Sequence, residues 1–402
     1  MNSHVFTFCP APAGKGQDGL KVAIQPNMSC QGWPSSAGSI ALENYIALDD
    51  ATAVRLLKQS GAKIVGSVHM SELGLGLLGN TAGRPVVENF ADVSLITDNL
   101  GEARVAAACA KLFGFKPSYG IVSRWGLIGL IPSMECWGIA ARDVSGIRSS
   151  LAAMCVADEQ DFSMIDETLP DFSESMVLKK PAGSIGVAEG YEKQLTESER
   201  AAWKSALAAM EKAGFEMVKI RLPDTALFSS VHNIIGAVEA SSSAGKYDGV
   251  RYGHRAEGCK NWNDMYLKSR GESFGTLIKS YLFQGAYFQF ENYSAFENAC
   301  RVRKRLVDET HEALVQVDWI AALCIRENRD AYQSSSISDI YEAFSFTVPA
   351  SLTGLPAIQL PDVALCGNKD FGLQLAGRPM SDPELLELAA YLGPKKVGGR
   401  TK

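Results

Sequence analysis

The sequence predicts an α/β fold. Short runs rich in β-branched and aliphatic residues alternate with longer runs of helical periodicity over most of the 402 residues. With 46% hydrophobic residues and mixed charge, the chain is long enough to bury one large core. Because neither a repeat nor a long linker interrupts this pattern, we expect a single domain over residues 1–402.

Residues 21–220 supply most of the alternation. We expect strands at 21–25, 63–68, 184–188 and 216–220, and helices at 50–60, 102–113, 144–154 and 197–213. Residues 164–181 are polar and bounded by proline, so we expect this segment to cross the surface between two lobes.

The second half begins with a long helical stretch and ends with strands. Residues 224–316 have mostly helical patterning, and we expect strands at 319–324, 357–360 and 372–376. A final helix is expected at 382–392.

Composition disfavours several classes of protein. The net charge of −6 and pI of 5.6 leave no basic stripe for phosphates, so we expect no direct nucleic-acid binding. No apolar run reaches the roughly 18 residues that span a bilayer, so we expect no membrane contact. Nine cysteines without a C-x-x-C pair or a secretion signal indicate the cytoplasm. The five histidines are scattered, so we expect no metal and no cofactor.

Several phrases of the sequence occur in an order that is typical of one family. A run from Thr97 through Glu102 opens a helix rich in small residues and continues to Ile128; further phrases lie at 249–255, 269–275, 347–356 and 372–378. Together they resemble the amidase signature family, and are most similar to its glutamyl-tRNA(Gln) amidotransferase A subunits. The resemblance implies a mixed central β-sheet flanked by helices on both faces, with 347–356 and 372–378 among the closing strands.

The same resemblance implies that the catalytic triad of the family is missing. The family uses a serine nucleophile, a second serine that bridges to it, and a buried neutral lysine. Gln25 stands where the lysine belongs, and an amide is no base at neutral pH. Residues 80–92 lack the glycine-serine loop that carries the bridging serine, and Glu102 replaces the nucleophile. Because the sequence begins close to the first strand, we also expect the N-terminal helices common in the family to be absent.

Glu102 has two interpretations. As a nucleophile it forms a mixed anhydride, a high-energy intermediate. As a first-turn acid three residues after Asn99, it matches a capping box and gains about 0.3 to 1 kcal/mol from the helix dipole. We favour capping, which predicts a solvated helix end around Gln25 and Glu102. An enclosed cleft with converging donors would count against the capping interpretation. We also expect Leu100 to crowd the backbone amides that hold an oxyanion in the family.

Residues 34–39 are another serine-rich stretch. Their position after the first strand matches an ordinary turn and helix start in the family, so we expect their hydroxyls to cap a helix.

The substrate anchors of the family are also replaced. The resemblance places Tyr281 at an arginine and Phe344 at an aspartate that hold the substrate's charged groups. Ser133 and Glu135 lie in a sequence motif that resembles a loop on the substrate side of the family's active site. The aspartate and glutamine of the family motif are replaced in this chain. These four residues are our candidates for a remodelled and more apolar ligand pocket.

These observations favour a pseudoenzyme. We expect no amidase turnover, and a role in binding either a protein partner, including a second copy of the chain, or a small ligand near Tyr281 and Phe344. The alternative is an active amidohydrolase or an amidotransferase A subunit that has recruited a different nucleophile. Such an enzyme needs a serine or cysteine beside a base.

Overall fold

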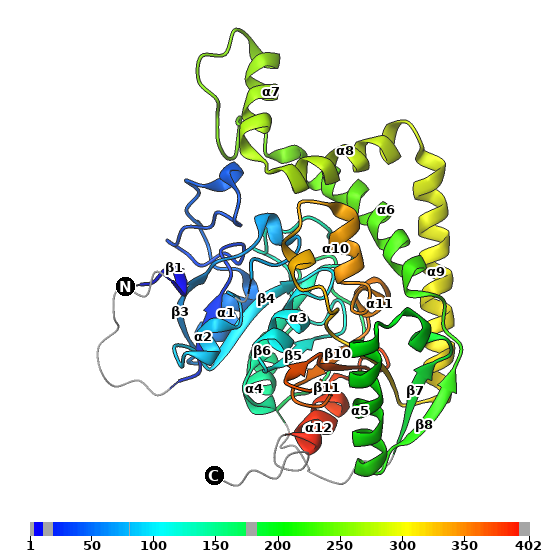
Figure 1. The fold of residues 1–402 in the computed structure, drawn as a ribbon. Coiled ribbons are helices and arrows are strands. Elements are labelled where there is room, and N and C mark those ends of the chain that lie inside the picture. Colours follow the sequence, from blue (N-terminus) through cyan, green and yellow to red (C-terminus); the bar gives the residue numbers. More distant parts are fainter. Residues whose placement is uncertain (1–3, 11–18, 80, 174–182, 394–402) are drawn as a thin grey trace.

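A mixed sheet of eleven strands runs through the structure (Figure 1). The computed structural model describes residues 4–10, 19–79, 81–173 and 183–393. In spatial order the strands are β1 (Phe6–Phe8), β3 (Lys63–Val68), β2 (Lys21–Ile24), β4 (Val93–Asp98), β6 (Cys136–Ala141), β5 (Phe113–Lys116), β10 (Ala357–Leu360), β13 (Leu373–Ala376), β9 (Trp319–Leu323), β7 (Ser184–Ala188) and β8 (Glu216–Ile220). A separate hairpin pairs β11 (Leu365–Cys366) with β12 (Lys369–Asp370).

Apart from the edge strand β1, which pairs antiparallel with β3, the sheet is parallel near its two ends and antiparallel in its middle. Strand β2 runs parallel to β3 and β4, and β7 runs parallel to β8 and β9. From β4 through β6, β5, β10 and β13 to β9, every neighbouring pair is antiparallel. The mixed sheet implied by the family resemblance is therefore confirmed.

Helices cover both faces of this sheet. One face carries α1 (Thr52–Gln59), α4 (Val144–Met154), α5 (Glu197–Ala213) and α12 (Asp382–Leu392). The opposite face carries α3 (Glu102–Cys109), α6 (Thr225–Ser243), α8 (Thr276–Phe290), α9 (Tyr293–Gln316), α10 (Ile337–Ala343) and α11 (Val348–Thr353). Helix α7 (Trp262–Ser273) lies beyond α8, away from the sheet, and the short α2 (Arg84–Val87) packs on β4 (Figure 1).

Alternation along the central strands separates the two cores. In β6, Trp137 and Ile139 pack toward α1 and α4, whereas Ala140 packs toward α3. Successive side chains of a strand point to opposite faces, so a strand buried on both sides becomes a nearly continuous apolar run. All six residues of β6 are buried, as this position requires.

Local signals in the sequence set several helix boundaries. Thr196 and Glu199 form a complete capping box at the start of α5, and Gly214 ends it in the left-handed conformation. Asp143 caps α4 through the amide of Gly146, and Asp224 caps α6. Seven predicted elements have the predicted bounds: β3, α4, β7, α5, β8, β10 and α12.

Two predicted elements are wrong. The helix expected at 102–113 ends at Cys109, and Phe113 already belongs to β5, because Lys111 turns the chain with a positive φ of 54°. The stretch 347–356, expected among the closing strands, contains α11, with Pro349 in its first turn and Gly354 after its end. Strands β1, β4, β5 and β6 were not predicted at all. Of the segment 164–181, residues 174–181 lie outside the described residues.

In the part of the chain that the structure describes, no helix is both long and apolar enough to cross a bilayer.

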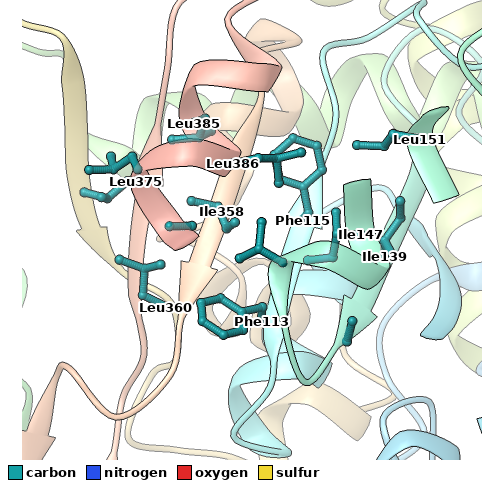
Figure 2. Packing of buried hydrophobic residues seen from close by; sticks show 14 of the residues in the cluster. Phe113, Phe115, Ile139, Ile147, Leu151, Ile358, Leu360, Leu375, Leu385 and Leu386 are labelled. Atoms are coloured by element: carbon teal, nitrogen blue, oxygen red, sulfur yellow. The ribbon is translucent and has the colours of Figure 1, made fainter. Parts of the chain in front are cut away.

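The core beneath α4 and α12 joins strands from distant parts of the chain. Figure 2 shows Phe115 of β5 and Ile358 of β10 packed against Leu386 of α12 and Leu151 of α4. Leu386 is fully buried in this cluster. The packing holds the middle of the sheet together, because β5 and β10 are also hydrogen-bonded neighbours.

Replacing Leu386 with alanine tests this core. Leu386→Ala removes buried methyl groups and leaves a cavity, so we expect the free energy of unfolding to fall by about 2–5 kcal/mol. Denaturant unfolding measures it, with Leu267→Ala on the exposed face of α7 as the control, where little change is expected. Equal losses in the two variants would contradict the assignment of Leu386 to the core.

Candidate functional site

The candidate site lies at the turn that joins β4 to α3. Strand β4 ends at Asp98, and the chain enters α3 at Glu102. Gly101 has a φ of 130°, and a Cβ atom there would lie 2.1 Å from Oγ1 of Thr347. Only glycine fits this turn, which brings the backbone of α3 close to the start of α11. The Thr347 hydroxyl in turn donates to the carbonyl of Leu100 at 2.6 Å.

The carboxylate of Glu102 fills the concave side of this turn. Its Oε2 accepts from the amides of Asn99 at 2.7 Å, Leu100 at 2.8 Å and Gly101 at 3.2 Å. Its Oε1 accepts from the amide of Gly76 at 3.3 Å, which comes from a distant loop. Three successive main-chain amides that converge on one oxygen form an anion-binding nest, and here the protein's own side chain occupies it.

The surroundings of Glu102 differ from the solvated helix end that we expected. Glu102 is 2% exposed and Gln25 is 5% exposed, so the site is enclosed and its donors converge. The capping box forms only in part, because Asn99 uses its side chain to donate to the carbonyl of Gly74 rather than to cap α3. Leu100 does not crowd its neighbours' amides away, since its own amide is one of the three donors.

Burial controls the charge of Glu102. Burial and the nearby Asp98 carboxylate raise the pKa of Glu102 to about 8, and the amide donors act in the opposite direction. None of the causes of this shift is a basic side chain. A carboxyl with this pKa is mostly neutral at pH 7, so it is a poor nucleophile there.

Gln25 is bound to the same strand. Its Oε1 accepts from the amide of Thr97 at 2.8 Å, and Asn27 donates to the Thr97 hydroxyl at 2.7 Å. The Oδ1 atoms of Asn27 and Asn99 are buried and have no hydrogen-bond partner among the described residues. The position that the resemblance assigns to a basic lysine is therefore held by an amide that serves as a structural acceptor.

A buried ion pair anchors the turn from behind. Arg104 on α3 donates to both carboxylate oxygens of Asp98, at 2.8 and 3.1 Å, and both side chains are fully buried. The guanidinium also donates to Ser351 at 2.7 Å, to the carbonyl of Thr347 at 3.0 Å and to Gln374. One side chain thus fixes β4, α3, α11 and β13 relative to one another.

A chain of buried rings approaches the turn from α6, α8 and α10. The hydroxyl of Tyr281 lies 2.8 Å from that of Tyr341, which lies 2.9 Å from Nδ1 of His232. His232 Nε2 is 3.2 Å from the carbonyl of Asn99. Burial, with a smaller effect of Arg303, lowers the pKa of His232 to about 3, so the imidazole is neutral at pH 7. Sequence reasoning did not identify His232 or Tyr341, because no local pattern links them.

The four predicted pocket residues are all hydrogen-bonded or packed within the protein. Tyr281 and Phe344 are fully buried, and the Phe344 ring packs edge-on against Tyr332 at 4.9 Å. Ser133 accepts from Arg303 at 2.8 Å, and its amide donates to Glu239. The Glu135 carboxylate accepts from Arg124 and from the amides of Leu130 and Ile131.

The prediction for residues 34–39 is confirmed at Ser39. Its hydroxyl oxygen accepts from the amide of Ala41 and caps the short 3-10 helix Ile40–Leu42. The same hydroxyl donates to the Glu72 carboxylate at 2.6 Å.

This chain is similar to known proteins over most of its length. A protein-family model described as Amidase matches residues 15–97 and 86–386. The A subunit of glutamyl-tRNA(Gln) amidotransferase from Halorhodospira halophila is 31% identical over 389 residues, which cover 89% of this chain and 79% of the relative.

Solved structures show the same fold. The glutamyl-tRNA(Gln) amidotransferase A subunit of Thermotoga maritima superposes with a TM-score of 0.79 at 22% identity, covering 97% of this chain and 88% of that one. A chain from a vestigial protein complex related to the origins of an s-triazine catabolic enzyme gives a TM-score of 0.76 at 19% identity, covering 93% of this chain and 83% of that one.

Removal of the Arg104 guanidinium tests the anchor. Arg104→Met leaves the Asp98 carboxylate buried without its cation, so we expect a loss of about 3–5 kcal/mol in the free energy of unfolding. Lys304→Met, which breaks an exposed pair with Asp308 on α9, is the control and should change little. The two variants are compared by denaturant unfolding, and a loss no larger in Arg104→Met than in the control would contradict the anchoring role.

The raised pKa of Glu102 predicts a specific pH dependence. Between the unfolded pKa near 4.5 and the folded pKa of about 8, the folded state binds one proton more, so Glu102 lowers stability as pH rises. Glu102→Gln removes this effect, and its stability relative to the parent should grow by up to about 1.4 kcal/mol per pH unit from pH 5 to 8.

Unfolding curves at each pH measure this difference, with the exposed Glu297→Gln as the control. Parallel pH profiles for Glu102→Gln and the parent would instead mean that the three amides hold an ionised carboxylate throughout this range.

Proposed function

Because the chain belongs to the amidase signature family, we propose that it is a catalytically inactive member that binds a partner polypeptide. The observation that carries the proposal is the Glu102 carboxylate, which accepts from three amides of the turn. In an acyl-transfer enzyme, such donors must be open to the oxygen of the substrate. Here they are filled by a side chain from the same turn, so a substrate oxygen has no place beside them.

The groups around Glu102 support the same proposal. A carboxyl that is protonated at neutral pH is a weak nucleophile, and Gln25 provides no base. Asp98, the second cause of the raised pKa, is already paired with Arg104. Attack by Glu102 would also break its three amide contacts in the first step, which raises the barrier instead of lowering it.

An exposed aromatic face on α8 supports the partner role. Phe283, Tyr287 and Phe290 are 74%, 50% and 75% exposed, and their spacing places them on one side of the helix. The helix lies at the outer end of the molecule, next to α7 (Figure 1). Aromatic residues are enriched at protein interfaces, and the relative from Halorhodospira halophila is itself named as one subunit of an enzyme. We therefore assign α8 to contact with an apolar surface of a partner polypeptide.

The second non-catalytic hypothesis, a small ligand near Tyr281 and Phe344, has less support. Both rings are fully buried, and the Tyr281 hydroxyl is engaged by Tyr341. A ligand there has to displace packed rings, which carries an energetic penalty that a surface contact avoids.

The alternative function is an active amidase or amidotransferase A subunit. The observation that favours it is the hydroxyl of Tyr341, which lies 2.9 Å from Nδ1 of His232 in the same buried region. Tyr341 is 6% exposed and its hydroxyl also meets Tyr281, so substrate access requires rearrangement of α8.

Ammonia release decides between these functions. With glutamine, asparagine and benzamide as substrates, we expect the purified protein to release no more than one equivalent of ammonia per chain. Glu102→Gln is the matched variant, since it keeps the shape of the side chain. Sustained release that Glu102→Gln abolishes would make Glu102 catalytic, and sustained release that it leaves intact would reveal another nucleophile. Either result overturns the proposal.

The partner contact is tested on α8 itself. We expect the tagged parent chain to recover a stoichiometric partner from its own cells, and the double variant Phe283→Ser, Phe290→Ser to lose it, because the apolar contact area is removed. Leu267→Ser on the neighbouring α7, 72% exposed, is the control and should keep the partner. Identical recovery by the double variant and the control contradicts an interface on α8.

A further inference from the structure

Two neighbouring parallel strands send the chain to opposite faces of the sheet. Strand β7 is followed by α5, which packs on the face of α4 and α12, whereas β9 is followed by α10 and α11 on the other face. Strand β8 lies on the far side of β7 from β9, so the strand order reverses between β7 and β9. In open α/β sheets, such reversals leave a crevice outside the carboxyl ends of the strands, and ligands bind there.

A cavity of about 340 Å³ lies at this reversal. Its walls come from the carboxyl ends of β7 and β8, from β9, and from α6, α9 and α11. Small side chains leave the space open, among them Ala188, Ala322 and Ala350. The rings of Phe228 and Phe346 form two further apolar walls. The volume falls within the range of about 300–1,000 Å³ that is typical of small-molecule sites.

The charges of this cavity lie at its mouth. Glu189, Lys193 and Asp224 belong to the loops after β7 and β8, and all three are at least partly exposed to solvent. The remaining lining residues are apolar or uncharged. An ionised ligand would lose its hydration inside without gaining a counter-charge, so the interior favours a neutral molecule.

The threonine hydroxyls of the wall can accept hydrogen bonds and have none to donate. Thr310 on α9 donates to the carbonyl of Leu306 at 2.6 Å, and Thr353 on α11 donates to that of Pro349 at 2.7 Å. Each oxygen keeps acceptor capacity after its hydrogen is used. A polar ligand group that meets these two hydroxyls is therefore a donor.

We propose that the crevice between β7 and β9 binds an uncharged small molecule with a hydrocarbon body and one N–H or O–H group. The inference goes beyond the proposed function and does not depend on it. None of the residues that hydrogen-bond the Glu102 carboxylate lines this cavity. An experiment can therefore disprove the small-molecule site without disproving the proposed function, and the reverse also holds.

A set of matched probes tests the chemistry. 2-Naphthalenemethanol has the required body and donor, 2-methylnaphthalene lacks the donor, and 2-naphthoate carries a charge. Titrations followed by protein NMR should show saturable binding of the alcohol, with an affinity about 3- to 10-fold higher than that of 2-methylnaphthalene, as one hydrogen bond provides. No binding of 2-naphthoate is expected at the same concentrations.

Two filling variants test the location. Ala322→Leu and Ala350→Leu each place a larger side chain in the cavity from a different wall, so each should weaken binding of the alcohol at least tenfold while the fold is retained by circular dichroism. Ala209→Leu on the outer part of α5 adds the same bulk outside this cavity and is the control.

A crystal soaked with the alcohol should show it between β7 and β9, which provides a test if both filling variants fail to fold. The proposal is overturned if none of the neutral probes binds, if 2-naphthoate binds as well as the alcohol, if folded filling variants bind like the control, or if the soaked alcohol lies elsewhere.

Discussion

The buried guanidinium of Arg104 is the contact on which the candidate site depends. Arg104 lies on α3 and donates hydrogen bonds to three other elements. Its partners are Asp98 at the end of β4, Thr347 and Ser351 at the start of and within α11, and Gln374 on β13. A cation in this position requires a carboxylate beside it, because an unpaired charge there is strongly destabilising. The pair therefore holds the turn between Asp98 and Glu102 in one conformation, and that conformation points three amides at one spot.

The proposed lack of amidase turnover depends on which group occupies the space in front of these three amides. An open nest of amides stabilises charge that develops in a substrate, whereas a filled nest stabilises the protein that fills it. In this chain the Glu102 carboxylate fills the nest. The crevice between β7 and β9 has a different structural origin. It results from the order of the strands and from the small alanine side chains in its walls.

Much of the fold was predictable where local signals agree with tertiary structure. The bounds of α5 follow from a capping box at Thr196 and a glycine at 214, and both act within one turn of the helix. Strands β4 and β6 were missed because they are buried on both faces and show no alternation to detect. The end of α3 was misjudged because the turn at Lys111 gives no glycine or proline signal.

The sequence by itself determined the family and the absence of a serine at position 102, since residue identities and their order carry that information. Only the tertiary structure decided where the Glu102 carboxylate lies. Its surroundings come from Gly76, His232 and Tyr341, which are distant in the chain, and the chain fold alone brings them together. A local pattern could predict an acid at a helix start, but burial and charge depend on neighbours that local patterns do not include.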